Sequence, residues 1–240
     1  MVPWTGAILI LLVSMFRRDQ RRRWLDLTTV IGYTVYVAVG TQLTILLAQK
    51  MTRTYDAAFF RADALLGFNP VAFADAISHH WLVSVILILA YVSLPALIGF
   101  AWVLEQDLLM RRAVLLAGCV CFVFYGLFPA VGPGHFDWTL QVPTSAPDNC
   151  MPSMHLTWAL LIAINARSMR LRLGLWVNVA LTVVATLALR EHYLVDLIAA
   201  VPYTLAIQWM ARHYKSYLPV FNAITSRANA GRLERGESQL

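Results

Sequence analysis

Three ionisable residues, His155, His192 and Asp196, lie at the margins of long apolar segments of this 240-residue chain. Ionisable groups in such positions cost roughly several kcal/mol unless they are paired or hydrated, so by default they mark functional sites. His192 and Asp196 are four residues apart, which places them on one face of a predicted helix. There the carboxylate can accept the proton of one ring nitrogen and leave the other nitrogen free as a nucleophile or base. The spacing therefore predicts an oriented, activated imidazole.

The second histidine belongs to the string Pro152-Ser153-Met154-His155, at the start of another apolar segment. Residues 132–153 form a connection too rich in Pro and Gly for a helix, and a loop of that length without secondary structure is usually functional. The simpler interpretation is that both histidines are satisfied interfacial residues. The pair, the aspartate and the loop on one side of the molecule favour a catalytic site.

The elements that must position these residues are membrane helices. Hydrophobic residues make up 59% of the chain and charged residues 13%, against about 25% charged in soluble proteins. Uncharged blocks cover residues 27–48, 81–104, 113–131 and 173–189. Each is close to the ~20 residues that a helix needs to cross the hydrocarbon core. A soluble single-core protein is excluded.

Two weaker blocks, residues 154–166 and 193–211, complete an all-α, polytopic bundle of six transmembrane helices. Residues 52–80 predict a short interfacial segment on the outer side: a helix over 55–66, a break at Gly67, and a second helix with Asn69 as N-cap and Pro70 at its first position. Residues 1–16 form either a short extra helix or an interfacial one. We predict an N-terminal apolar segment with a basic stretch (1–23), one six-helix membrane domain (24–212) and a cytoplasmic tail (213–240).

The basic residues indicate how the bundle is oriented. The net charge is +6, and only four of the 19 basic residues, Lys50, Arg53, Arg61 and Arg190, fall on the side of the three ionisable residues. The other fifteen therefore mark the cytoplasmic side and act as topology anchors, with no need for a nucleic-acid partner. Of the three cysteines, Cys119 and Cys121 lie inside an apolar helix and Cys150 faces the outer aqueous edge. No Cys or His spacing repeats as a ligand pair, so we expect no metal and no cofactor.

Pro152-Ser153-Met154-His155, followed by His192-Tyr193-Leu194-Val195-Asp196, resembles the second and third motifs of the type 2 phosphatidic acid phosphatase superfamily. The His-Tyr-x-x-Asp form is most similar to the branch of inositol phosphorylceramide and sphingomyelin synthases. The resemblance implies six helices around a site at the outer membrane face. It also implies that His192 is the nucleophile that forms a phosphohistidine, that Asp196 orients it, and that His155 protonates the departing oxygen.

The chain departs from the better-known branch of this family at its phosphate clamp. Ala185 and Thr186 stand where a Ser-Arg pair is usual, and no lysine lies between Lys50 and Lys215. Arg190, two residues before His192, is the best substitute because a guanidinium can hold a phosphate bidentately. Further candidates for binding the substrate are then Ser153, His135 and Arg61, with the backbone amides of Gly132 and Gly134 as an anion nest. Asp63 is expected to neutralise Arg53 or Arg61.

These observations predict an enzyme of lipid metabolism that dephosphorylates a lipid phosphate, with membrane lipids as its surroundings and a bacterial inner membrane as its location. Transfer of the phosphorylated head group to an acceptor alcohol, as in the synthases, is the alternative reaction. A haem protein that uses His155 and His192 as axial ligands is an alternative of another class, although it leaves Asp196 unexplained. A transporter is disfavoured because no inverted repeat is visible.

Overall fold

The computed structural model describes residues 4–16, 19–50, 54–105, 107–139, 142–143 and 150–213. Its helices are α1 (Trp4–Met15), α2 (Gln20–Lys50), α3 (Asp56–Leu65), α4 (Pro70–Ser78), α5 (Trp81–Glu105), α6 (Leu108–Leu127), α7 (Met154–Asn165), α8 (Met169–Ala188) and a final helix, Leu194–His213. A two-residue antiparallel ribbon, β1 (Phe136–Asp137) and β2 (Val142–Pro143), lies in the long loop. The protein is an all-α polytopic membrane protein, as its composition predicts.

Five helices in the described part of the chain are long and apolar enough to cross a membrane: Asp26–Leu46, Trp81–Glu105, Leu108–Leu127, Met169–Ala188 and Leu194–His213. They match five of the six predicted spans. The sixth, expected over residues 154–166, is helical, but α7 has only 12 residues. At 1.5 Å per residue it is about 18 Å long, little more than half of a hydrocarbon core of about 30 Å.

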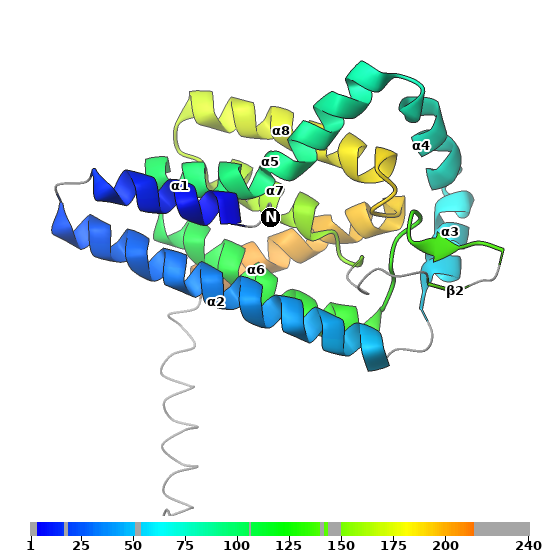
Figure 1. Ribbon diagram of the computed structural model, residues 1–240, viewed down its shortest axis with the longest axis horizontal. Coiled ribbons are helices and arrows are strands. Elements are labelled where there is room, and N and C mark those ends of the chain that lie inside the picture. Colours follow the sequence, from blue (N-terminus) through cyan, green and yellow to red (C-terminus); the bar gives the residue numbers. More distant parts are fainter. Residues whose placement is uncertain are drawn as a thin grey trace, which may run out of the picture.

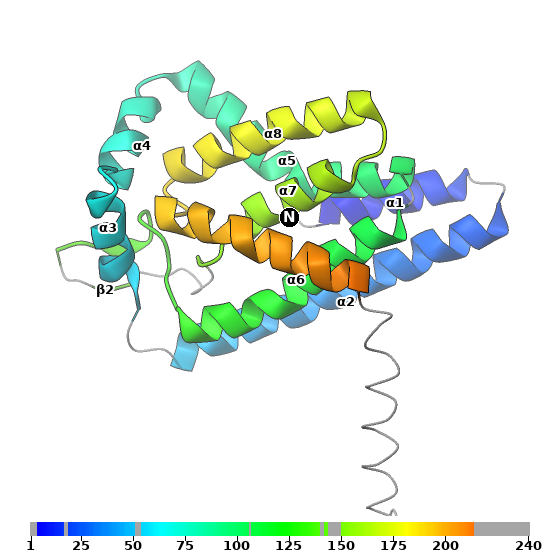
Figure 2. The same ribbon diagram turned by 180° about the vertical axis from the view of Figure 1, so that it is seen from behind.

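The short helix α7 lies at the centre of the bundle. It packs against α5, α6 and α8, and Figures 1 and 2 show it enclosed from both sides. Near its end, Asn165 exchanges two hydrogen bonds with Gln208 of the final helix, at 2.9 and 2.7 Å. Its start is fixed by Ser153, the N-cap, whose hydroxyl accepts a hydrogen bond from the Leu156 amide. The rest of the fold therefore holds the helix that carries His155 on all sides.

The N-terminal helix α1 is part of the bundle. It runs alongside α2 and packs against α2 and α5, and it buries Ala7, Ile10 and Ser14 (Figure 1). Of the two alternatives left open by the sequence, the structure supports an additional short helix. The predicted C-terminal tail, residues 213–240, lies outside the described residues except for His213.

The predicted interfacial segment has its expected form. The Asn69 side chain accepts hydrogen bonds from the amides of Val71 and Ala72, and Gly67 adopts a φ of 75° at the break between α3 and α4. Both short helices lie at one end of the bundle, across the ends of the long helices (Figure 1).

One basic residue has a role beyond orienting the bundle. Arg111 at the start of α6 is buried, donates to Thr29 at 2.7 Å and to the Trp102 carbonyl at 3.0 Å, and forms an ion pair with Asp26 at 3.2 Å. It therefore links α6 to α2 and α5. The interpretation of all fifteen basic residues of this set as topology anchors alone is too simple.

Candidate active site

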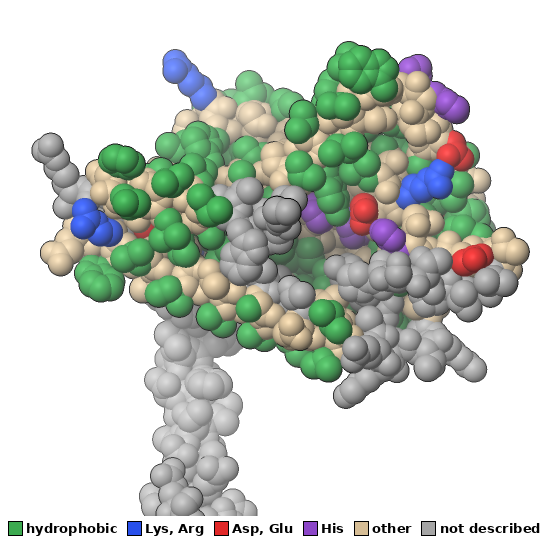
Figure 3. All heavy atoms as spheres, in the orientation of Figure 1, with side chains coloured by type: hydrophobic (Ala, Val, Ile, Leu, Met, Phe, Trp, Pro, Cys, Tyr) green, Lys and Arg blue, Asp and Glu red, His purple; other side chains and the backbone are tan. Residues whose placement is uncertain are grey.

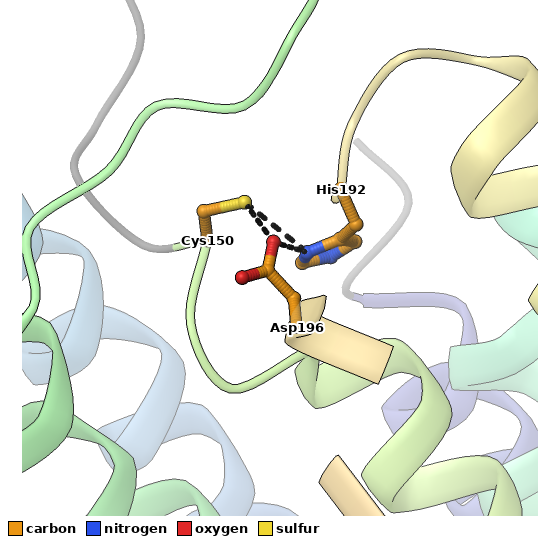
Figure 4. Close-up of side chains that lie close together, drawn as sticks. All are labelled: Cys150, His192 and Asp196. Atoms are coloured by element: carbon orange, nitrogen blue, oxygen red, sulfur yellow. Dashed lines mark hydrogen bonds and ion pairs between the residues drawn. The ribbon is translucent and has the colours of Figure 1, made fainter. Parts of the chain in front are cut away.

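His192 and Asp196 come together at the start of the final helix. His192 precedes that helix, which begins at Leu194, so the two residues do not share a helical face as predicted. Their side chains nevertheless meet, with His192 Nδ1 3.5 Å from Asp196 Oδ2 (Figure 4). The same carboxylate oxygen accepts the Tyr193 amide at 2.9 Å, as an acidic residue does when it caps the start of its own helix. Asp196 is completely buried and His192 is 5% exposed.

Cys150 completes this group, a role that its position in the sequence does not reveal. Its thiol donates to Asp196 Oδ2 at 2.6 Å, and Sγ lies 3.4 Å from His192 Nδ1 (Figure 4). The prediction that Cys150 faces water is wrong, because the residue is 2% exposed. Burial, together with the negative charge of Asp196, raises the pKa of the Cys150 thiol well above its usual value, so the thiol stays protonated at neutral pH.

His155, in the first turn of α7, lies opposite His192. The two ring centroids are 6.4 Å apart, and the His155 ring stacks on Tyr91 of α5 at 3.9 Å. Ser153 is fully buried, with its hydroxyl engaged as the N-cap, so substrate contact by Ser153 stays a prediction. Figure 3 shows histidine and acidic side chains together on the part of the surface next to α3 and α4, while apolar side chains cover much of the remaining face.

Arg190 has an unusual backbone and an acidic partner. Its φ is 60°, its carbonyl accepts the Gly134 amide at 2.8 Å, and its guanidinium pairs with Asp75 of α4. Gly132, at φ 93°, lies so close that a Cβ on it would be 2.4 Å from the Glu191 carbonyl oxygen. Only glycine allows the loop to approach the turn before His192 in this way.

The predicted anion nest is wrong. The Gly132 amide donates to Asp56 Oδ1 at 3.0 Å and the Gly134 amide to Arg190, so both amides are already engaged. His135 also has an acidic neighbour, because its Nε2 lies 3.7 Å from Glu191 Oε1. Arg61 is exposed on α3. The structure thus brings His155, His192 and Asp196 together and leaves phosphate binding by Arg190, His135 and Arg61 a prediction.

Two carboxylates of α3, which were not among the predicted site residues, accept hydrogen bonds from the backbone around the site. Asp56 accepts the amides of Val131 and Gly132 and the Tyr193 hydroxyl, the last at 2.9 Å. Asp63 accepts the amides of Leu194 and Val195 at 2.8 and 2.9 Å and thereby caps the final helix. Asp63 does not serve to neutralise Arg61, and Arg53 lies outside the described residues.

The signal for these two residues was present in the sequence. Asp56 and Asp63 are seven residues apart, on one face of α3, and both are completely buried. Two acidic residues on one face of a helix whose only other charged residue is Arg61 indicate a face that contacts backbone donors.

Taken together, the fold and this group of residues define an integral membrane protein with an imidazole–carboxylate site at one end of its bundle. A family profile described as the PAP2 superfamily matches residues 57–210, more than half of the chain, and the protein belongs to that superfamily. No curated protein and no solved structure matches the chain. Membership supports a phosphatase or phosphotransferase activity. It gives no support to the haem alternative.

Proposed function

We propose that the protein dephosphorylates a lipid phosphate through a phosphohistidine formed on His192. The main support for this proposal is the orientation of the His192 imidazole. Its Nδ1 is turned towards Asp196 Oδ2, at 3.5 Å, and Cys150 Sγ, at 3.4 Å. Nε2 is then the nitrogen left free to attack phosphorus. The 6.4 Å between the His192 and His155 ring centroids allows both rings to reach one phosphate group.

The reaction has two steps. His192 Nε2 forms a bond to phosphorus while the bond from phosphorus to the lipid oxygen breaks. His155, which becomes protonated when the negatively charged phosphate lies beside it, gives its proton to that oxygen. Neutral His155 then accepts a proton from water, whose oxygen attacks the phosphohistidine and releases inorganic phosphate. The Asp196 carboxylate stabilises the positive charge that develops on His192 in the first step.

The distribution of charge supports a proposal for the side of the membrane on which the site lies. Arg167 and Arg170 lie exposed at the turn between α7 and α8, at the end of the bundle opposite to His192. With the cytoplasm on that side, the site faces outwards, to the periplasm of a bacterial inner membrane.

Transfer of the phosphorylated group to an alcohol is the second candidate reaction. The His-Tyr-x-x-Asp form of the motif, His192 to Asp196, favours it. In both reactions the first step is the same. They differ only in whether water or a lipid or polyol hydroxyl attacks the phosphohistidine.

The test is incubation of the purified protein with a panel of phosphorylated lipids, following released phosphate and new lipid products with and without acceptor alcohols. We expect His192→Ala to lose at least about a thousandfold in turnover and to form no alkali-stable phosphoprotein, as removal of a nucleophile does. His80→Ala is the matched control, because His80 is exposed between α4 and α5. More than a tenth of wild-type turnover in His192→Ala contradicts the proposal.

A further inference from the structure

Cys150, His192 and Asp196 offer three different ligand atoms at one point. Sγ, Nδ1 and a carboxylate oxygen all lie within 4.8 Å of one another, and the three residues are buried (Figure 4). A thiolate, an imidazole nitrogen and a carboxylate are the ligand types that Zn²⁺ takes in proteins. The chain contributes them from the long loop and from the start of the final helix, so no local spacing in the sequence reveals the set.

The distances suit such an ion with one adjustment. Zinc bonds of about 2.3 Å to sulfur and 2.0 Å to nitrogen or oxygen place tetrahedral ligand atoms about 3.5 Å apart. The Sγ–Nδ1 distance is 3.4 Å and the Nδ1–Oδ2 distance is 3.5 Å. Only the Sγ–Oδ2 contact, at 2.6 Å, has to widen, by about 1 Å, when a metal ion replaces the shared proton.

A second observation points to a ligand at the same place. The other carboxylate oxygen, Asp196 Oδ1, is buried and has no hydrogen-bond partner within the described residues. A buried carboxylate oxygen without a partner is destabilising. A cation beside the carboxylate would remove that deficit.

We propose that Cys150, His192 and Asp196 bind one thiophilic divalent cation of the Zn²⁺ class. The thiol loses its proton to solvent, a sulfur–metal bond forms, and no group is oxidised or reduced. The metal takes the lone pair of His192 Nδ1, which confines the ring proton to Nε2. If His192 is the nucleophile of the proposed reaction, Nε2 can then no longer attack phosphorus, so the bound cation inhibits the enzyme.

Binding is measured without turnover, by titrating the full-length purified protein with Co²⁺ and following the thiolate-to-cobalt charge-transfer absorption. We expect one equivalent per chain and one proton released per ion, with affinity that rises with pH because metal and proton compete for the thiolate. Cys150→Ser should remove the band and weaken Co²⁺ binding at least about tenfold. Replacing a residue that only supports a metal ligand already costs about that much, so loss of a ligand should cost no less. Cys121→Ser is the matched control, since Cys121 is equally buried but lies in α6.

Absence of the band in the wild-type protein, or its persistence in Cys150→Ser, overturns the proposal. If Cys150→Ser does not fold, Asp196→Asn serves instead and should weaken Co²⁺ binding while retaining a thiolate band at higher metal concentration; unchanged affinity in that variant also overturns it. Zn²⁺ inhibition that a chelator reverses is the activity readout. A protein that shows the band but no turnover of any phosphorylated lipid keeps the metal site and refutes the proposed function instead.

Discussion

Tyr91 and His155 lie face to face: their ring centroids are 3.9 Å apart and their planes differ by 18°. Tyr91 comes from α5 and His155 from the first turn of α7. The stack fixes one face of the imidazole and leaves its edge, with both nitrogens, for other contacts. Tyr91 is therefore a positioning residue for the proposed acid.

This relationship predicts a shared kinetic signature. His155→Ala should reduce turnover of substrates with poor leaving groups by about 10²–10⁴-fold and affect good leaving groups much less, because only proton donation is lost. Tyr91→Leu should show the same dependence on the leaving group, and Tyr91→Phe, which keeps the ring, should restore near-normal rates. The measurement is kcat over a series of phosphate esters. Equal losses for all esters in Tyr91→Leu would mean that the stack only supports the fold.

Arg190 and Asp75 form an ion pair between the turn before His192 and α4, with both side chains more than one third exposed. If the guanidinium also holds the substrate phosphate, Arg190→Lys should lower kcat/KM at least about tenfold, because the planar fork is lost. Asp75→Asn should stay within about twofold of the wild type, since a surface ion pair contributes little. Steady-state kinetics on one lipid phosphate provides the comparison. Similar losses in the two variants would assign the pair a structural role.

Asp56 should stabilise the site more than any single hydrogen bond does. It accepts from Val131, Gly132 and Tyr193 while fully buried, so Asp56→Asn places an amide donor against existing donors. We expect a loss of about 1–3 kcal/mol in the free energy of unfolding, typical of an unsatisfied buried group. Tyr193→Phe removes one of these bonds and should cost less. Thermal unfolding in detergent measures both, with Asp137→Asn in the half-buried ribbon as the control.

Cysteine reporters can test on which side of the membrane the site lies. Because native Cys150 is buried, it is unsuitable as the label; Leu66→Cys, in the exposed turn after α3, replaces it. Ser168→Cys, between α7 and α8, is the matched position at the opposite end. A membrane-impermeant thiol reagent on intact cells should label the first and not the second. The reverse pattern would place the site on the cytoplasmic face.

Locally encoded features of the fold could be predicted from the sequence. Gly67, Asn69 and Pro70 act on their immediate neighbours, so the break and the cap between α3 and α4 are found where expected. The apolar blocks also locate every long helix. The weaker block over residues 154–166 likewise places α7 to within one residue, but its 12 residues are too few for the membrane span that was expected there.

Contacts between distant segments could not be predicted in the same way. The Cys150–Asp196 hydrogen bond joins residues 46 positions apart, and the Tyr193–Asp56 bond joins residues 137 positions apart. The anion nest failed for the same reason: a Gly-rich string shows that amides are available, but not that Asp56 already occupies one of them. The motif residues could be predicted because histidine and aspartate are themselves reactive side chains. The residues that support them, such as Asp56 and Cys150, acquire their role only through packing.

The short helix α7 sets the depth of the proposed reaction. Its C-terminal end is level with the C-terminal end of α5, where the Ser168 amide donates to the Glu105 side chain. All of its missing length is therefore at the other end, and His155 stacks on Tyr91 rather than near Trp81, where α5 begins. Those ten positions correspond to about 15 Å along α5. If the proposed function holds, the lipid head group reacts well inside the start of α5, beyond a stretch whose exposed large side chains, such as Trp81, Leu82 and Leu89, are apolar. We therefore expect the turnover rate to depend on the thickness of the bilayer as well as on the chemical step.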